Sequence, residues 1–194
     1  MVMVYNKLLN FTGVTGSSWQ CRNGGKMDFL ELSHIRFSVL EYENRPVEQE
    51  KIDKIIEVAI SAPTACNYQP QRILVIDDDE GRQKLNRVVP SKYNIPVAIL
   101  ICYDKQECWI RPMDGKASGD IDASIVATHM MMEATELGLG SIWVMYWDPE
   151  KMKAEFELDD EIEPSALLVV GYKSEKAKPR QGHLTRKRPE DILM

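Results

Sequence analysis

Two short segments of the chain combine groups that suit a phosphate with groups that suit the rim of a polar ring. Arg36-Phe37-Ser38 places a guanidinium two residues before a hydroxyl. The guanidinium is a planar fork of donors that matches a phosphate, and Ser38 lies on the same side as Arg36 if the backbone there is extended. In residues 61–70, Asn67 and Gln69 each offer donors and acceptors. Such amides suit a ring edge on which C=O and N–H groups alternate.

A predicted helix precedes each of these segments. Asp28 is a good N-cap for a short amphipathic helix that runs to His34. Pro46, together with the acidic residues Glu48 and Glu50, suits the start of a second helix, and Pro63 ends it. Apolar residues recur at helical spacing in between, at Ile52, Ile55, Ile56, Ala59 and Ile60.

Helices and strands then alternate, although not as a strict βαβ repeat. The first two helices come before any strand, so the sequence predicts a single α+β layer fold without internal repeats. Apolar runs predict strands at residues 72–76, 97–103, 141–146 and 166–170. Weaker patterns predict two short helices, at residues 81–89 and 149–156.

A helix predicted from Asp120 to Leu137 is apolar almost all round. A helix without a polar face must be covered on every side, which is difficult in a chain of this size and favours a dimer. Gly138 is expected to end this helix, Asp120 to cap its start, and His129 to be a buried histidine with its hydrogen bonds satisfied. Because Gly138 follows a helix and precedes a strand, the reverse of a dinucleotide fingerprint, a Rossmann site is not expected.

Composition excludes several classes of protein. The 194 residues are 44% hydrophobic and 28% charged, as in a globular domain. The net charge is −6, and basic residues are scattered until the tail, which argues against a nucleic-acid surface. No apolar run reaches the ~18 residues of a membrane span, and the first residues are a poor secretory signal. We therefore expect a cytoplasmic protein without nucleic-acid or membrane partners.

The four cysteines show neither a CxxC pair nor a histidine at metal-ligand spacing, so no metal site is expected. Cys102 lies in an apolar run and is expected to be a buried small hydrophobe. Residues 1–26 are rich in Gly, Ser, Asn and Thr and precede Met27. We interpret them as an N-terminal extension outside the core, either an upstream extension or a flexible arm, and residues 27–194 as the folded domain.

Five segments, in this order, resemble the nitroreductase family. The resemblance runs from Met27 to about Asp191 and rests on the combination, since each segment alone would be weak. The segments are Arg36-Phe37-Ser38; Ala62-Pro63-Thr64 with Asn67 and Gln69-Pro70; the helix with Asp122 and its Met run; Gly138-Leu139-Gly140-Ser141-Ile142-Trp143; and Gly171-Tyr172 followed by the basic residues 179–188.

The resemblance implies a nitroreductase-like three-layer fold, in which a central, mostly antiparallel sheet is flanked by helices and a long helix is buried at the interface of a homodimer. It implies FMN as cofactor, with Arg36, Ser38 and the basic tail from one subunit and Pro63, Thr64 and Asn67 from the other. No protein side chain is expected to be catalytic, because the flavin N5 carries the chemistry. The implied FMN-binding residues are Arg36, Phe37, Ser38, Leu40, Pro63, Thr64, Asn67, Gln69, Trp143, Val144, Met145, Tyr146, Arg186, Lys187 and Arg188.

The chain departs from the family pattern at three places. Leu40 stands where a second basic residue is frequent, so one phosphate or ribose contact is missing there. Gln71 stands where Trp is frequent, which either opens the pocket or changes which aromatic ligand stacks there. The tail segment Arg186-Lys187-Arg188 has one basic residue more than expected, which leaves open which of the three reaches the phosphate.

The implied activity is that of an oxidoreductase that uses NADH or NADPH to reduce the flavin and then reduces a nitroaromatic, quinone or similar acceptor, in a ping-pong mechanism. The chain has no evident triad, dyad or metal site, and flavin chemistry needs few protein acids or bases. Three alternatives stay open. The same scaffold supports reductive dehalogenation and flavin breakdown. The protein could also be a flavin-binding or redox-sensing dimer without turnover, or a dimerisation module that has lost flavin.

Overall fold

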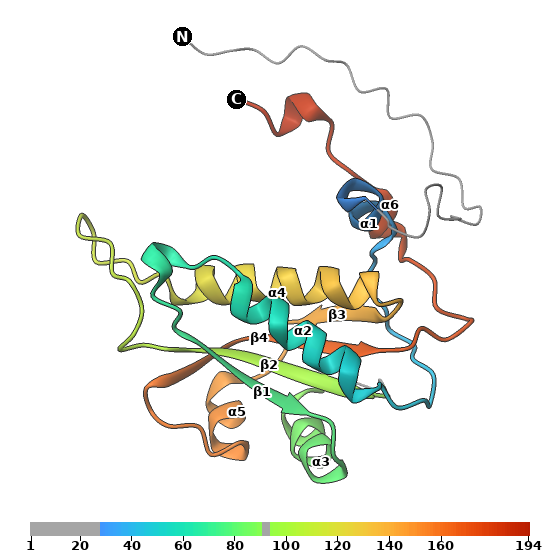
Figure 1. The fold of residues 1–194 in the computed structure, drawn as a ribbon, viewed down its shortest axis with the longest axis horizontal. Helices are drawn as coiled ribbons and strands as arrows, with labels where there is room; N and C mark the ends of the chain where they lie inside the picture. Colours follow the sequence, from blue (N-terminus) through green and yellow to red (C-terminus); the bar gives the residue numbers. More distant parts are fainter. Residues whose placement is uncertain (1–27, 91–93) are drawn as a thin grey trace.

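The computed structural model describes residues 28–90 and 94–194. Within them, a four-stranded sheet lies between two layers of helices, with α2 and α4 on one face and α3 and α5 on the other (Figure 1). This confirms the predicted three-layer α+β fold. The predicted extension, residues 1–26, falls outside the described residues.

The sheet is antiparallel throughout. Its strands are β1 (Gln71–Ile76), β2 (Val97–Asp104), β3 (Gly140–Val144) and β4 (Ile162–Gly171), in the spatial order β1-β2-β4-β3. Strand β3 is shorter than the predicted 141–146. Its last pair joins Val144 to Leu167, and the chain then turns, with the Trp147 amide donating to the Met145 carbonyl at 3.2 Å. Met145 and Tyr146 therefore lie beyond the strand.

The helices follow the local signals closely. They are α1 (Phe29–Ile35), α2 (Gln49–Ser61), α3 (Asp79–Val88), α4 (Gly119–Glu136), α5 (Pro149–Glu155) and α6 (Gln181–Leu184), with 3-10 turns η1 (Ala65–Asn67) and η2 (Pro189–Asp191). Asp28 caps α1 as predicted, and Glu31 completes a capping box. Ala62, just before Pro63, is extended and ends α2.

The core is divided by the sheet into two parts. Along β2, Ile99 and Ile101 pack under α2 and α4, while Leu100 and Cys102 pack against α3 and α5. Because both faces of the strand are covered, it is a continuous apolar run instead of an alternating one. Cys102 is 2% exposed, as predicted, and burial raises the pKa of its thiol to about 12.

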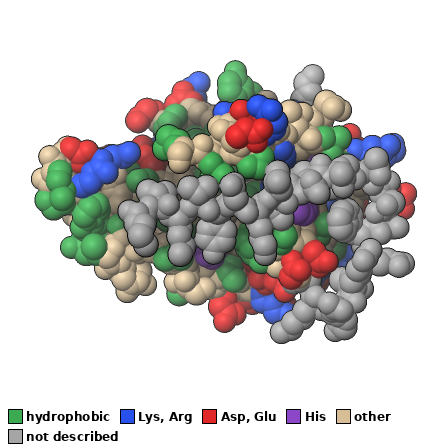
Figure 2. Space-filling view, turned by 90° about the horizontal axis from the view of Figure 1, so that it is seen from above, with side chains coloured by type: hydrophobic (Ala, Val, Ile, Leu, Met, Phe, Trp, Pro, Cys, Tyr) green, Lys and Arg blue, Asp and Glu red, His purple; other side chains and the backbone are tan. Residues whose placement is uncertain are grey.

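Helix α4 is buried on one side only in the single chain. Ala123, Val126 and Met130 are fully buried against the sheet, whereas Ile121 is 50% exposed and helps to line a shallow groove on the outer face with Asp120, Ser124, Ile125, Thr128 and His129. Figure 2 looks onto this side of the molecule and shows hydrophobic side chains among charged ones. None of the helices in the described residues is long and apolar enough to cross a membrane.

Two expectations for α4 are wrong. Asp120 does not cap the helix, because the helix begins at Gly119 with Ser118 as N-cap residue, and the Asp120 carboxylate instead accepts a bond from Ser165 Oγ at 2.7 Å. His129 is exposed and not buried. Its Nδ1 lies 2.9 Å from the Ile125 carbonyl oxygen one turn earlier.

Candidate cofactor site

The Arg36-Phe37-Ser38 segment is extended and lies against the edge of the sheet. Arg36 ends α1 with φ −65° and ψ 126°. Ser38 forms a parallel bridge with Ser141 at the start of β3, and the Val39 amide donates to the Ser141 carbonyl at 3.0 Å. Because the segment is extended, Arg36 and Ser38, two residues apart, lie on the same side of the backbone.

Three basic side chains gather beside this segment, and we call Arg36, His183 and Arg186 the cationic cluster. Arg186 donates to the carbonyls of His183 and Thr185 and lies 3.4 Å from His183 Nδ1. Burial, and then the charge of Arg186, lower the pKa of Arg36. In the described part of the chain, no carboxylate bonds to the side chains of the cluster. Like charges held together without a counter-charge indicate a place for an anion.

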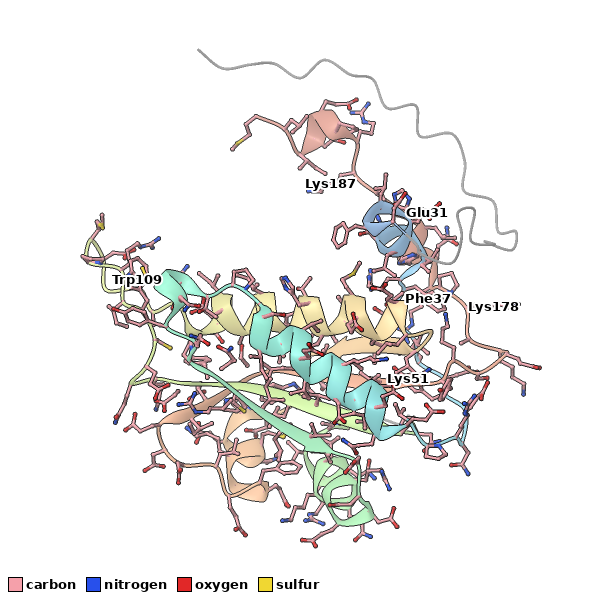
Figure 3. All side chains as sticks on the ribbon, viewed as in Figure 1. Glu31, Phe37, Lys51, Trp109, Lys178 and Lys187 are labelled. Carbon is pink, nitrogen blue, oxygen red and sulfur yellow. The ribbon has the colours of Figure 1, made fainter. Side chains whose placement is uncertain are left out.

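The structure separates the three basic residues of the tail. Arg186 contacts His183, and its charge lowers the pKa of Arg36. Arg188 is engaged locally, with ion pairs to Glu190 at 3.2 Å and Asp191 at 3.3 Å. Lys187 is exposed on the segment between α6 and η2, which extends away from the sheet (Figure 3). Arg186 is therefore the residue of the three best placed for a phosphate.

The second motif forms a tight loop with unusual backbone angles. Cys66, Asn67 and Gln69 have φ values of 49°, 58° and 53°, in the left-handed region that Asn tolerates better than most residues. Thr64 accepts a bond from the Gln69 amide through its hydroxyl at 3.0 Å. The amide side chains of Asn67 and Gln69 are both exposed, and Gln69 Nε2 donates to the Asn67 carbonyl at 3.3 Å.

A buried carboxylate holds this loop on the start of α4. Asp122 is 1% exposed, and its two oxygens accept from the Ala65 amide at 2.8 Å and from Ser118 Oγ at 2.6 Å. The sequence analysis included Asp122 among the segments that resemble the family, but it did not predict that this carboxylate anchors the loop. The local feature that could have indicated it is the spacing of four residues between Ser118 and Asp122, which puts the two side chains on one face at the start of a helix.

The remaining predicted residues lie along the edge strand β3 and the segment after it. Trp143 and Val144 are half-buried, and the Trp143 indole donates to Met145 Sδ at 3.0 Å. Met145 and Tyr146 are 64% and 80% exposed. Leu40 is half-buried just after the bridge between Ser38 and Ser141 and supplies no charge. Pro63 is exposed at the start of the second motif.

The two motifs lie at opposite ends of α4 (Figure 1). The cationic cluster and Ser38 stand near the C-terminal end of this helix, beside the start of β3, whereas the loop of residues 62–70 is tied to its N-terminal end. With 18 residues, α4 is about 27 Å long. The structure thus brings Arg36, Ser38 and Arg186 together, but it does not bring them to Thr64, Asn67 or Gln69 of the same chain.

A family description and known relatives agree with this architecture. The model of the nitroreductase family matches residues 35–95 and 89–172, so the chain belongs to the nitroreductase family. A nitroreductase family protein from Clostridium difficile 630 has a crystal structure that matches with a TM-score of 0.82 and 45% identity, over 87% of this chain and 98% of that one.

Two curated relatives carry names that state an activity. A "Putative NADH dehydrogenase/NAD(P)H nitroreductase" from Methanothermobacter thermautotrophicus is 28% identical over 167 residues, which cover 80% of this chain and 82% of the relative. An "FMN reductase [NAD(P)H]" from Bacillus subtilis is 27% identical over 163 residues, which cover 74% of this chain and 66% of the relative.

Proposed function

We propose that the protein is an FMN-dependent oxidoreductase of nitroreductase type. It takes electrons from NADH or NADPH and passes them to a nitroaromatic, quinone or similar acceptor in two alternating half-reactions at one site. The names of the relatives support the cofactor and the electron donor. The structural observation that carries the proposal is the cationic cluster beside Ser38, because within the described residues no carboxylate bonds to its side chains and their charges fit a single terminal phosphate.

The donor set of the two motifs fits FMN. Arg36 and Arg186 supply two guanidinium groups for the phosphate, and the Ser38 hydroxyl adds a third donor. Asn67 and Gln69 offer amides for the ring edge. A bound flavin supplies hydride acceptance and donation. The residues of this chain would hold the phosphate, orient the ring and exclude water, so the reaction needs no acid–base dyad from the protein.

The same geometry supports a homodimer with shared sites. Within one chain, the cationic cluster and Asn67 are separated by roughly the length of α4, about 27 Å. One FMN would have to span this distance if its phosphate bound at the cluster and its ring at Asn67 of the same chain. Two copies that pack through the outer face of α4 bring the cluster of one to the loop of the other. The half-exposed Ile121 and the shallow groove on that face are apolar surface that such packing would cover.

The cofactor can be identified directly. The purified protein is incubated with FMN or FAD, freed of excess ligand and heated, and the released flavin is analysed by chromatography. We expect one FMN per chain and no retained FAD. The Arg36→Ala variant should lose the flavin, whereas Arg87→Ala should keep it, since Arg87 pairs with Glu155 on the opposite face of the sheet. Bound FAD, or no bound flavin, would overturn the proposal.

Turnover is tested with the same preparation. Anaerobic addition of NADH or NADPH should bleach the flavin absorbance, and a nitroaromatic or quinone should restore it. A protein that keeps FMN but is not bleached by either nucleotide would be a flavin-binding protein without this activity. Bleaching without reoxidation by these acceptors would direct attention to the dehalogenation and flavin-breakdown chemistries.

A further inference from the structure

His183 is the member of the cationic cluster for which no role has been given. It lies in the four-residue helix α6, half-buried against the end of α1, with its ring at 61° to the Phe37 ring and the two centroids 6.2 Å apart. Figure 3 shows Phe37 close to the end of α4, below α1 and α6. The imidazole is thus held by an aromatic contact on one side and by Arg186 on the other.

The contact with Arg186 favours one state of the ring. An arginine guanidinium can only donate, so the approach of Arg186 Nη2 to His183 Nδ1, at 3.4 Å, suits a neutral imidazole that accepts at Nδ1 and carries its hydrogen on Nε2. Burial, followed by the charges of Arg186 and Arg36, lowers the pKa of His183 and so favours the same neutral form.

The two charges that lower the pKa of His183 are positive: Arg186 acts from the tail and Arg36 from the end of α1. Lys173, just after β4, lies with Nζ 5.8 Å from the centroid of the Phe37 ring. The titratable groups on α1 are Glu31 and His34, and the Glu31 carboxylate accepts from the Asp28 amide at the far end of that helix. Within the described residues, the hydrogen bonds of the His183 ring involve no carboxylate. A phosphate dianion that binds here would place negative charge beside the imidazole and so favour its protonated form.

We propose that His183 is a further ligand of the FMN phosphate, besides Arg36, Arg186 and Ser38, and takes up one proton when the cofactor binds, so that cofactor loading is coupled to pH. This inference rests on the proposed function for the identity of the anion. The proton comes from solvent and bonds to Nδ1, and no other bond to the ring changes. Arg186 then loses its acceptor on His183 and is free to turn its fork toward the phosphate, beside an imidazolium that donates as well.

The sign of the pH dependence follows from the proton taken up. In the free protein the lowered pKa of His183 favours the neutral ring above about pH 6.5, whereas in the proposed complex the phosphate favours the charged ring. Uptake of one proton makes the dissociation constant for FMN rise by up to about tenfold per pH unit above about pH 6.5. The phosphate itself loses charge only near pH 6, and that change weakens binding as the pH falls, which is the opposite sign.

The experiment uses the full chain stripped of flavin. The dissociation constant for FMN is measured by flavin fluorescence between pH 6.5 and 8.5, and calorimetry in two buffers of different ionisation enthalpy counts the protons taken up. His183→Gln keeps a polar side chain that cannot be charged, and it should abolish the slope and the proton uptake. His34→Gln is the matched control and should keep both. Riboflavin, which lacks the phosphate, should bind without a slope.

Each result has a separate consequence. A slope that persists in His183→Gln, or that disappears in His34→Gln, overturns the assignment to His183. FMN binding that is independent of pH in the unmodified protein overturns the proton coupling and leaves the proposed function standing. Failure to bind FMN at any pH overturns the proposed function itself. If His183→Gln is poorly folded by circular dichroism, His183→Asn and its riboflavin affinity provide the same comparison.

Discussion

Replacement of Arg36 by alanine tests the phosphate half of the site most directly. The guanidinium is half-buried, stands beside Arg186 and has no carboxylate partner in the described residues. Its loss should therefore remove a charge-assisted contact to a dianion, about 2–4 kcal/mol of FMN binding free energy. That corresponds to a dissociation constant about 30- to 1000-fold higher. Arg36→Lys should recover only part of the affinity, because an ammonium lacks the fork.

The same change has an opposite effect on the protein without cofactor. In that state Arg36 and Arg186 repel each other, and within the described chain no carboxylate forms an ion pair with either of them. Arg36→Ala should thus leave the melting temperature of the flavin-free protein unchanged or raise it slightly, while it lowers that of the FMN-loaded protein. A variant that merely damaged the fold would lower both.

Fluorescence titration with FMN and thermal melts with and without FMN measure the two effects. Arg87→Ala serves as the control, because it also removes one arginine, but from an ion pair with Glu155 at 2.6 Å on the other face of the sheet. It should leave the affinity for FMN unchanged. An unchanged dissociation constant in Arg36→Ala would refute the assignment of this segment to the phosphate.

Three further results are expected. Mixing Arg36→Ala with Asn67→Ala subunits should restore one flavin site per heterodimer, because both lesions then fall in the other site; a flavin-loaded protein that runs as a monomer in light scattering would rule this arrangement out. Asp122→Ala leaves the Ala65 amide and Ser118 Oγ without their acceptor and should lower the free energy of unfolding by about 2–4 kcal/mol in urea titrations, whereas an unchanged midpoint would show that the anchor contributes little. Lys187→Ala should change FMN affinity far less than Arg186→Ala, and equal losses in the two variants would contradict the placement of Arg186.

The helices of this protein are encoded locally, which is why most of them could be predicted. The capping box of Asp28 and Glu31 and the proline after α2 act within a few residues of each helix end. The sequence left the backbone at Arg36 open, and the structure shows that it is extended. Strand β3 was predicted to end two residues too late, because its end is set by where pairing with β4 stops and not by the run of apolar residues.

The errors on α4 have the same origin. The sequence showed a helix with almost no polar face, but it did not show which side would meet the sheet, so His129 was expected to be buried and is exposed. Asp120 was expected to cap the helix. It instead binds Ser165 of β4, a residue 45 positions away that only the packing of helix on sheet brings near.

The amino-acid sequence determined the family, the α+β fold and the chemical character of the two motifs, because residue type and local spacing are sufficient for these. Only the tertiary structure decided how the motifs are arranged. It placed His183 and Arg186 of the tail beside Arg36, tied the Ala65 loop to Asp122 across 57 residues, and set the two half-sites at opposite ends of α4. Contacts between distant segments depend on the packing of whole layers, which no local pattern encodes.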